Sequence, residues 1–266
     1  MRASVAQRTA SQAGTGVGRA EPQAYVQRFT RWQVVQHAVL MVSFTGLAVT
    51  GIPQKYAQLA ISRWFIDAMG GIERVREIHH VMAWVLLGLG VVHALEMVAR
   101  ATRYGLRSQM WPSIQDVRDL VHQLRYFMGL ESEEPRFGRY SFKEKFEYWA
   151  VVWGTAVMGL TGLILLYPET ATRYLPGVAV PAARAAHGGE AVLAVVAILI
   201  WHMYNAHLRP EVFPMDPVIF TGRMPRERAL REHPLEFEPP ARASDQTSAT
   251  GAPLTSPGRG GGPSTP

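Results

Sequence analysis

Four long stretches without charge interrupt an otherwise charge-rich sequence, and they restrict the folds open to the chain more than any other feature. A helix that spans a bilayer needs roughly 20 mostly apolar residues, within a range of about 17–25. Helices of a soluble core would show a polar face every turn or so, and these stretches do not. Asp, Glu, Lys and Arg are absent from residues 32–54, 78–95, 148–168 and 191–208. The sequence therefore predicts an all-α integral membrane four-helix bundle, with helices at about 32–54, 76–99, 145–168 and 185–208.

The distribution of basic residues predicts the orientation of this bundle. Of 27 Lys and Arg residues, 21 lie before the first span, between the second and third spans, or after the fourth. Because cytoplasmic loops carry the excess of Lys and Arg, we expect both termini and the loop 100–144 to face the cytoplasm of a bacterial-type inner membrane. The net charge of +6 then indicates membrane lipid as a partner, and not nucleic acid.

The other segments divide the chain into four regions. Residues 1–24 lack the apolar core of a signal peptide, and we expect disorder there and in the low-complexity tail 241–266. Between them we predict a transmembrane domain, 25–210, and a cytoplasmic extension, 211–240. After Ser113, in the loop between the second and third spans, helical spacing favours an amphipathic helix on the cytoplasmic membrane surface. Its apolar residues are Ile114, Val117, Val121, Leu124 and Met128.

Histidines lie inside the apolar stretches, and an ionisable side chain at membrane depth is a functional hypothesis by default. Five of them are candidate ligands, namely His37, His79, His93, His187 and His202. His80 and His207 are close neighbours in the same helices, and we expect them to point away from the ligand face. Fourteen residues along an α-helix return to within about 40° of the same face, about 21 Å further along. His79 and His93 are fourteen residues apart, and His187 and His202 are fifteen apart. Because these two helices run parallel, His79 and His187 share an outer level, and His93 and His202 share an inner level.

Two imidazoles that face each other across a bundle are what a six-coordinate b-type haem requires, so the two levels predict two stacked haems. Zinc would need three or four ligands at one point, whereas these histidines form two separate levels. A proton relay would favour polar groups between His79 and His93, whereas that stretch is apolar. Both alternatives therefore fit less well than haem. His37 lies at the same depth as His93, and spacing alone leaves open which of them opposes His202. The chain has no Cys, which excludes iron–sulfur clusters, disulfides and covalent haem attachment through cysteine.

Charged residues near the two levels are candidates for binding propionates or moving protons. Arg74 and Arg76 lie on the outer side, where basic residues are scarce, and are the candidate propionate partners. Glu96 and Glu190 are candidates for proton transfer at a quinone site. For both carboxyls, the alternative is a structural group that is neutral and hydrogen-bonded, or paired with a nearby Arg. We find no nucleophile–base constellation, and therefore expect the chemistry to belong to the cofactor.

The four helical segments also resemble a known family, the cytochrome b membrane subunits of respiratory complexes. They resemble the formate dehydrogenase gamma subunit over about residues 28–238. The b-type cytochromes of nickel–iron hydrogenase and thiosulfate reductase are similar too. The segments that carry the resemblance are RFTRWQVVQHAVLMVSFTGLAVTGIP, REIHHVMAWVLLG, KFEYWAVVWGTAVMGLTGLILLYP and AHGGEAVLAVVAILIWHMYNAHLRP.

The resemblance implies two b haems and electron exchange with quinone near the inner haem. By position, it implies that His79 and His187 hold the outer haem and that His37 and His202 hold the inner one. His93 departs from the gamma-subunit pattern, because paired histidines on the second helix are similar instead to cytochrome b of the quinol:cytochrome c oxidoreductases. With His37 as the ligand, we expect His93 to hydrogen-bond a propionate or quinone, or to ligate a further haem.

These observations predict a subunit that transfers electrons between the quinone pool and a redox partner at the outer face. The partner must bring its own redox centre, as an iron–sulfur or molybdopterin dehydrogenase or a multihaem c-type cytochrome would. We do not expect the chain alone to act on a substrate other than quinone. Two alternatives come from other classes: a haem-containing membrane anchor or sensor without turnover, and a small transporter whose intramembrane histidines bind protons or metal.

Overall fold

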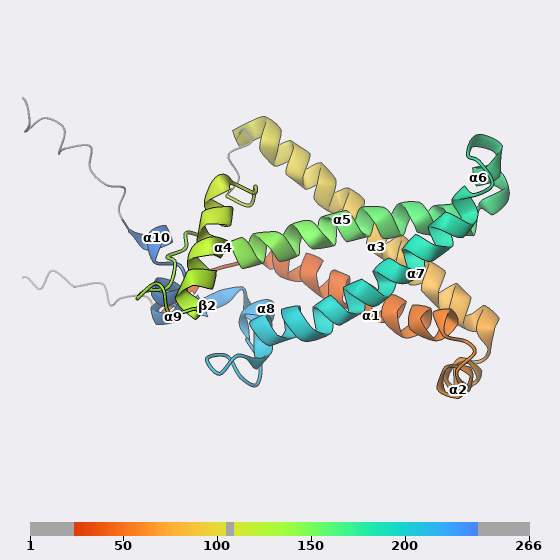
Figure 1. Cartoon of the computed structure of the whole chain (residues 1–266), viewed down its shortest axis with the longest axis horizontal. Coiled ribbons are helices and arrows are strands. Elements are labelled where there is room, and N and C mark those ends of the chain that lie inside the picture. The colour runs from red at the N-terminus through yellow and green to blue at the C-terminus, as the bar shows by residue number, and fades with distance from the viewer. Residues whose placement is uncertain (1–23, 105–108, 239–266) are drawn as a thin grey trace, which may run out of the picture.

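The computed structural model describes residues 24–104 and 109–238, and this part of the chain is mostly helical (Figure 1). Four of its helical segments are long and apolar enough to cross a membrane. The predictions of disorder fall almost wholly on residues outside this description. The four segments are α1 (Arg31–Lys55), α3 (Ile72–Tyr104), α5 (Phe142–Leu166), and α7 (Ala179–Ala197) followed by the π-helical turns η1 (Ile198–His202) and η2 (Tyr204–Leu208).

Capping boxes fix the first residues of two long helices. At α1, the hydroxyl of Thr30 accepts the N–H of Gln33 at 3.2 Å, and the Gln33 side chain accepts the N–H of Thr30 at 2.9 Å. At α5, Ser141 and Glu144 make the same reciprocal pair, at 3.3 and 2.8 Å. Each box satisfies two of the backbone donors that a helix start leaves without a partner, so both helices begin at defined residues.

Shorter elements gather at the two ends of the bundle (Figure 1). One end holds the connections between α1 and α3 and between α5 and α7, which are α2 (Ala60–Ala68) and α6 (Pro168–Tyr174). The side of the membrane that each end faces stays a prediction. The opposite end holds α4 (Ile114–Phe127), α8 (Val218–Thr221), β2 (Arg223–Pro225), α9 (Arg226–Glu232) and α10 (Pro234–Phe237).

Helix α4 begins after the predicted cap Ser113, whose N–H and hydroxyl both donate to the Asp116 carboxylate, at 2.6 and 3.0 Å. Lys145 on α5 pairs with the same carboxylate at 2.8 Å and so ties α4 to the bundle. Burial alone would raise the pKa of Asp116, but the hydrogen bonds from Lys145 and Ser113 outweigh it and hold that pKa below its ordinary value. The contact of α4 with a lipid surface stays a prediction. The apolar side chains that would make this contact are exposed: Ile114, Val117, Val121, Leu124 and Met128.

The long helices pack in two close pairs, α1 along α3 and α5 along α7. Small hydroxyl residues occupy their contacts: Ser43, Thr50 and Thr161 are buried, and each donates a 2.7 Å hydrogen bond to the carbonyl one turn earlier. Small residues let helices approach closely in lipid. Large apolar side chains such as Trp84 and Trp153 are exposed on the outer faces, as lipid contact requires.

A small cap closes the end of the bundle that carries α8 to α10. Strand β1 (Tyr25–Gln27) pairs antiparallel with β2, and Val26 lies opposite Met224. Met224 packs with Val218 and Ala229 in a compact apolar core. The all-α prediction did not include this pairing, which brings the segment before α1 against the segment that follows α7.

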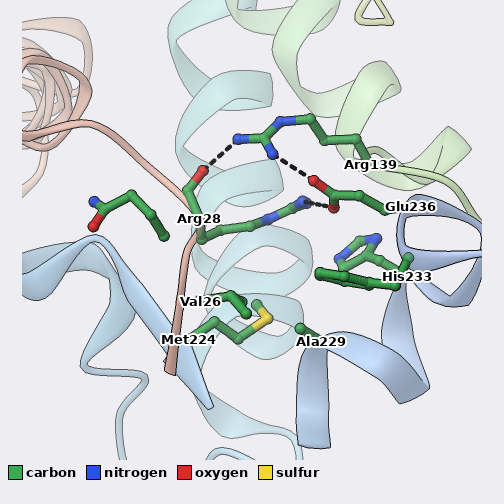
Figure 2. A pocket seen from close by; sticks show the side chains of 9 residues that line it. Val26, Arg28, Arg139, Met224, Ala229, His233 and Glu236 are labelled. Atoms are coloured by element: carbon green, nitrogen blue, oxygen red, sulfur yellow. Dashed lines mark hydrogen bonds and ion pairs between the residues drawn. The ribbon is translucent and has the colours of Figure 1, made fainter. Parts of the chain in front are cut away.

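Arg28 ties this cap to α5 through Glu144, and Figure 2 shows its contacts with Glu236 and Arg139. Its side chain is only 3% exposed and pairs with Glu144 at 2.8 Å and Glu236 at 3.5 Å. Arg139 donates to the Arg28 carbonyl at 2.7 Å, and His233 donates to a backbone carbonyl at 2.8 Å. Burial lowers the pKa of His233, and the Arg28 guanidinium lowers it further. Arg28, Arg139, His233 and Glu236 line a cavity of about 50 Å³ together with apolar residues of the cap.

Candidate functional site

The first histidine pair lies toward the α2 and α6 end of the bundle. His79 on α3 faces His187 on α7, with ring centroids 6.4 Å apart and an interplanar angle of 65°. Both side chains are half-buried between the helices. The structure therefore brings together the two residues that were assigned to the outer level.

Threonine hydroxyls fix the proton on each of these two rings. Thr50 on α1 lies 2.9 Å from Nδ1 of His79, and Thr161 on α5 lies 3.0 Å from Nδ1 of His187. Each hydroxyl already donates to a backbone carbonyl, so it accepts from the imidazole. Nδ1 then carries the ring proton, and the lone pair of Nε2 is free to bind a metal.

Glycines leave the space that the two rings occupy. A Cβ atom at Gly51 would lie 3.1 Å from Cε1 of His79, and one at Gly162 would lie 3.3 Å from Cε1 of His187. Each glycine directly follows the threonine that binds the same ring. The Thr-Gly dipeptide thus occurs on α1 and again on α5, and each copy contacts a different histidine ring. This repeat is visible in the sequence, but its residues were not among the predicted site residues.

The second pair lies toward the capped end. His37 on α1 faces His202, the last residue of η1, with ring centroids 6.3 Å apart and an interplanar angle of 47°. Nδ1 of His202 donates to the Glu147 carboxylate on α5 at 2.9 Å, which again leaves Nε2 free. Glu147 is a further residue that the sequence analysis missed.

The π-helical turns explain how His187 and His202 serve the same side of the bundle. A π-bulge adds about one residue to a helical turn and is frequent at functional sites. The fifteen-residue spacing therefore behaves like the fourteen-residue spacing that separates His79 from His93.

His93 lies at the predicted depth but is engaged elsewhere. Its Nδ1 lies 2.8 Å from the side-chain oxygen of Gln36 on α1 and therefore donates to it. Its Nε2 lies 2.9 Å from the hydroxyl of Tyr148 on α5, which donates in turn. Both ring nitrogens thus have protein partners between α1, α3 and α5, whereas His37 faces His202.

The two candidate carboxyls have different surroundings. Glu96 accepts hydrogen bonds from Trp32 at 3.0 Å and from Gln36 at 2.7 Å, and it pairs with Arg100 at 2.6 Å. Through Gln36 it is linked to the hydrogen bonds of His93. Glu190 is half-buried on α7 and directed at α5, where a Cβ atom at Gly154 would lie 3.2 Å from its Oε1.

The two candidate propionate partners are paired on their own helix. Arg74 binds Glu77 at 3.1 Å, and Arg76 binds the side chain of Glu73 at 2.9 Å. All four side chains are more than half exposed. A propionate role for either arginine would require these pairs to rearrange.

The donor set of the two histidine pairs fits axial ligation of haem iron. Metal–imidazole bonds of about 2 Å on both sides of one metal, plus the two ring radii, place the centroids roughly 6–6.5 Å apart. The two pairs measure 6.4 and 6.3 Å. Within residues 24–104 and 109–238, no three His, Asp or Glu side chains converge as a metal ion held by protein alone would require. Two ligands at each level, with the porphyrin supplying the rest, fit this arrangement.

Comparison with known proteins identifies the family. The model of the prokaryotic cytochrome b561 family matches residues 28–214. The chain belongs to this family. The expected membership among cytochrome b respiratory subunits is thereby confirmed, and the protein is a b561-type membrane electron-transfer subunit whose family implies b-type haem.

Three curated relatives carry the same name, the cytochrome b556(Fdn) subunit of nitrate-inducible formate dehydrogenase. They come from Escherichia coli strain K12, Escherichia coli O157:H7 and Shigella flexneri. Each is 24% identical to this chain over 212 residues, which cover 79% of this chain and 86% of the relative. The relationship therefore extends over most of both proteins.

Proposed function

We propose that this chain is the di-haem cytochrome b subunit of a membrane respiratory complex and carries electrons between the quinone pool and a redox partner at the outer face. The single observation that supports this most is the presence of two facing histidine pairs, one toward each end of the same bundle. A bound haem at each pair supplies one-electron chemistry. The two levels are separated by about 21 Å of helix.

In this proposal, His79 and His187 bind the outer haem, and His37 and His202 bind the inner one. The chain contributes by holding each ring at Nδ1, so that Nε2 faces the partner ring. The rings differ in their acceptors, because a hydroxyl binds each outer ring and a carboxylate binds His202. A carboxylate raises the basicity of an imidazole ligand, so the protein stabilises positive charge more strongly at the inner level.

Quinone exchange is proposed at the inner level. The hydrogen-bonded residues His93, Tyr148 and Gln36 lie there at membrane depth, and Gln36 directly precedes His37. Tyr148 and His93 have the polar groups that a quinone carbonyl or hydroxyl binds. Glu96 is linked to them and pairs with Arg100 near the end of α3, which suits a group that exchanges protons with the aqueous phase. Glu190, between the two levels, is proposed as a second proton carrier.

The outer-face partner is proposed to be a dehydrogenase with its own redox centres. The curated relatives are named as subunits of a formate dehydrogenase, which supports a partner of this class. The proposed orientation, with both termini in the cytoplasm of a bacterial inner membrane, rests on the distribution of basic residues.

Reduction by a quinol tests this proposal. We expect the purified chain to show a b-type spectrum when chemically reduced. We expect a short-chain quinol to reduce both haems, because the proposed quinone site would lie beside the inner histidine pair and the outer pair belongs to the same bundle. The measurement is a reduced-minus-oxidised optical spectrum with each reductant. Haems that dithionite reduces but no quinol reduces would favour the anchor or sensor. The absence of a b-type spectrum would leave only a transporter or a structural role.

A further inference from the structure

Lys55 lies beside the outer histidine pair. It occupies the last turn of α1, four residues after Gly51, and its side chain crosses to α7. A Cβ atom at Gly188 would lie only 2.9 Å from Lys55 Nζ, and 3.6 and 3.7 Å from its Cδ and Cε. Gly188 directly follows His187. The ammonium group therefore lies against the backbone next to one ring of the pair, in space that any larger residue at 188 would restrict.

The ammonium group forms no ion pair with the described part of the protein. In residues 24–104 and 109–238, no carboxylate lies within salt-bridge distance of Lys55, and the ring of Tyr56 is 5.5 Å from Nζ. A lysine in the last turn of a helix can also interact with the negative end of the helix dipole. That role would keep the ammonium near the carbonyls of α1, whereas here it reaches α7.

We propose that Lys55 binds a carboxylate of the outer haem, that is, one of its propionates. This inference rests on the proposed function, because it requires a haem between His79 and His187. The Lys55 side chain is exposed and has no carboxylate partner among the described residues, so its ammonium can bind an anion from a ligand. A propionate is the anion that a haem at this level provides. Lys55 would then be a positioning residue, and Arg74 and Arg76, which already pair with glutamates, would be dispensable for this contact.

A cation at the propionate has a measurable consequence for the haem. Reduction of the iron adds one negative charge to the cofactor, and a nearby positive charge favours that state. Removing the ammonium therefore lowers the midpoint potential of the outer haem. The inner haem, about 21 Å further along the bundle, changes much less because the interaction falls with distance and is screened.

The experiment is a spectroscopic redox titration of the purified full chain and of three variants, Lys55→Met, Lys55→Arg and Arg76→Met. His202→Ala, which we expect to retain only the outer haem, identifies the outer signal. We expect Lys55→Met to lower the outer midpoint potential or to release the outer haem, Lys55→Arg to restore the wild-type value, and Arg76→Met to leave it unchanged.

Two results would overturn the inference. One is an unchanged outer potential with full haem content in Lys55→Met. The other is a larger shift of the outer midpoint potential in Arg76→Met than in Lys55→Met, which would show that Arg76 binds the propionate. A wild-type chain without b haem would contradict the proposed function itself, and the two failures are thus distinguishable.

Discussion

We expect His202→Ala to remove one of the two proposed b haems and to leave the outer one in place. The substitution deletes the imidazole that faces His37 at 6.3 Å, and an iron with one remaining axial ligand is held far less tightly. The loss of about half of the haem is expected without loss of the bundle, because His202 is half-buried and the long helices pack through other residues. Haem extraction, measured per chain, gives the result directly.

The matched variants His37→Ala and His93→Ala decide which residue opposes His202. We expect His37→Ala to lose the same haem, because this ring faces His202. We expect His93→Ala to retain both haems, because its nitrogens bind Gln36 and Tyr148. The opposite pattern, with both haems kept in His37→Ala and one lost in His93→Ala, would make the assignment of the inner ligand wrong.

We expect His187→Ala to remove the proposed outer haem and to interrupt electron transfer to the outer face. Its ring is one of the two that meet at the outer level, 6.4 Å from His79. Because the inner pair lies about 21 Å away along the helices, a quinol should still reduce the inner haem. We expect reduction of an impermeant acceptor at the outer face of vesicles to fall to background, while the inner-haem spectrum persists.

His80→Ala is the control for this variant. His80 neighbours His79 but is exposed, with its ring centroid 6.5 Å from that of His79. It should retain both haems and the transfer to the outer acceptor. Unimpaired transfer in His187→Ala would mean that electrons do not pass through the outer pair, and the proposed path would be wrong.

The sequence predicted the long helices because the absence of charge over some twenty residues is a strong signal. It located their ends less well, since charge-free stretches mark only the apolar part of each helix. The fourth helix begins at Ala179 and not at about residue 185 as expected. Its start was placed too late because its first turns contain Pro181 and Arg184, which interrupt the apolar pattern. The β1–β2 pairing was not predicted, since each strand has three residues and they lie far apart in the chain.

The candidate site was only partly accessible from spacing. Helical periodicity gives the depth of a histidine and its face, but not the neighbour that this face meets. Depth therefore left His37 and His93 equivalent, and the packing of α1 against α3 and α7 separates them. The hydrogen-bond partners Thr50, Thr161 and Glu147 come from other helices than the rings they bind. The Thr-Gly repeat was a local signal for the two threonines, but it does not show which rings they contact.

The haem content of the wild-type chain tests the central claim most directly. The claim is that imidazoles from different helices meet in two pairs, each placed to hold one haem iron. Haem extraction from purified protein, produced in haem-replete cells, should give two b haems per chain, with optical spectra of six-coordinate, low-spin iron. A colourless preparation, or a single haem at saturation, would contradict the claim.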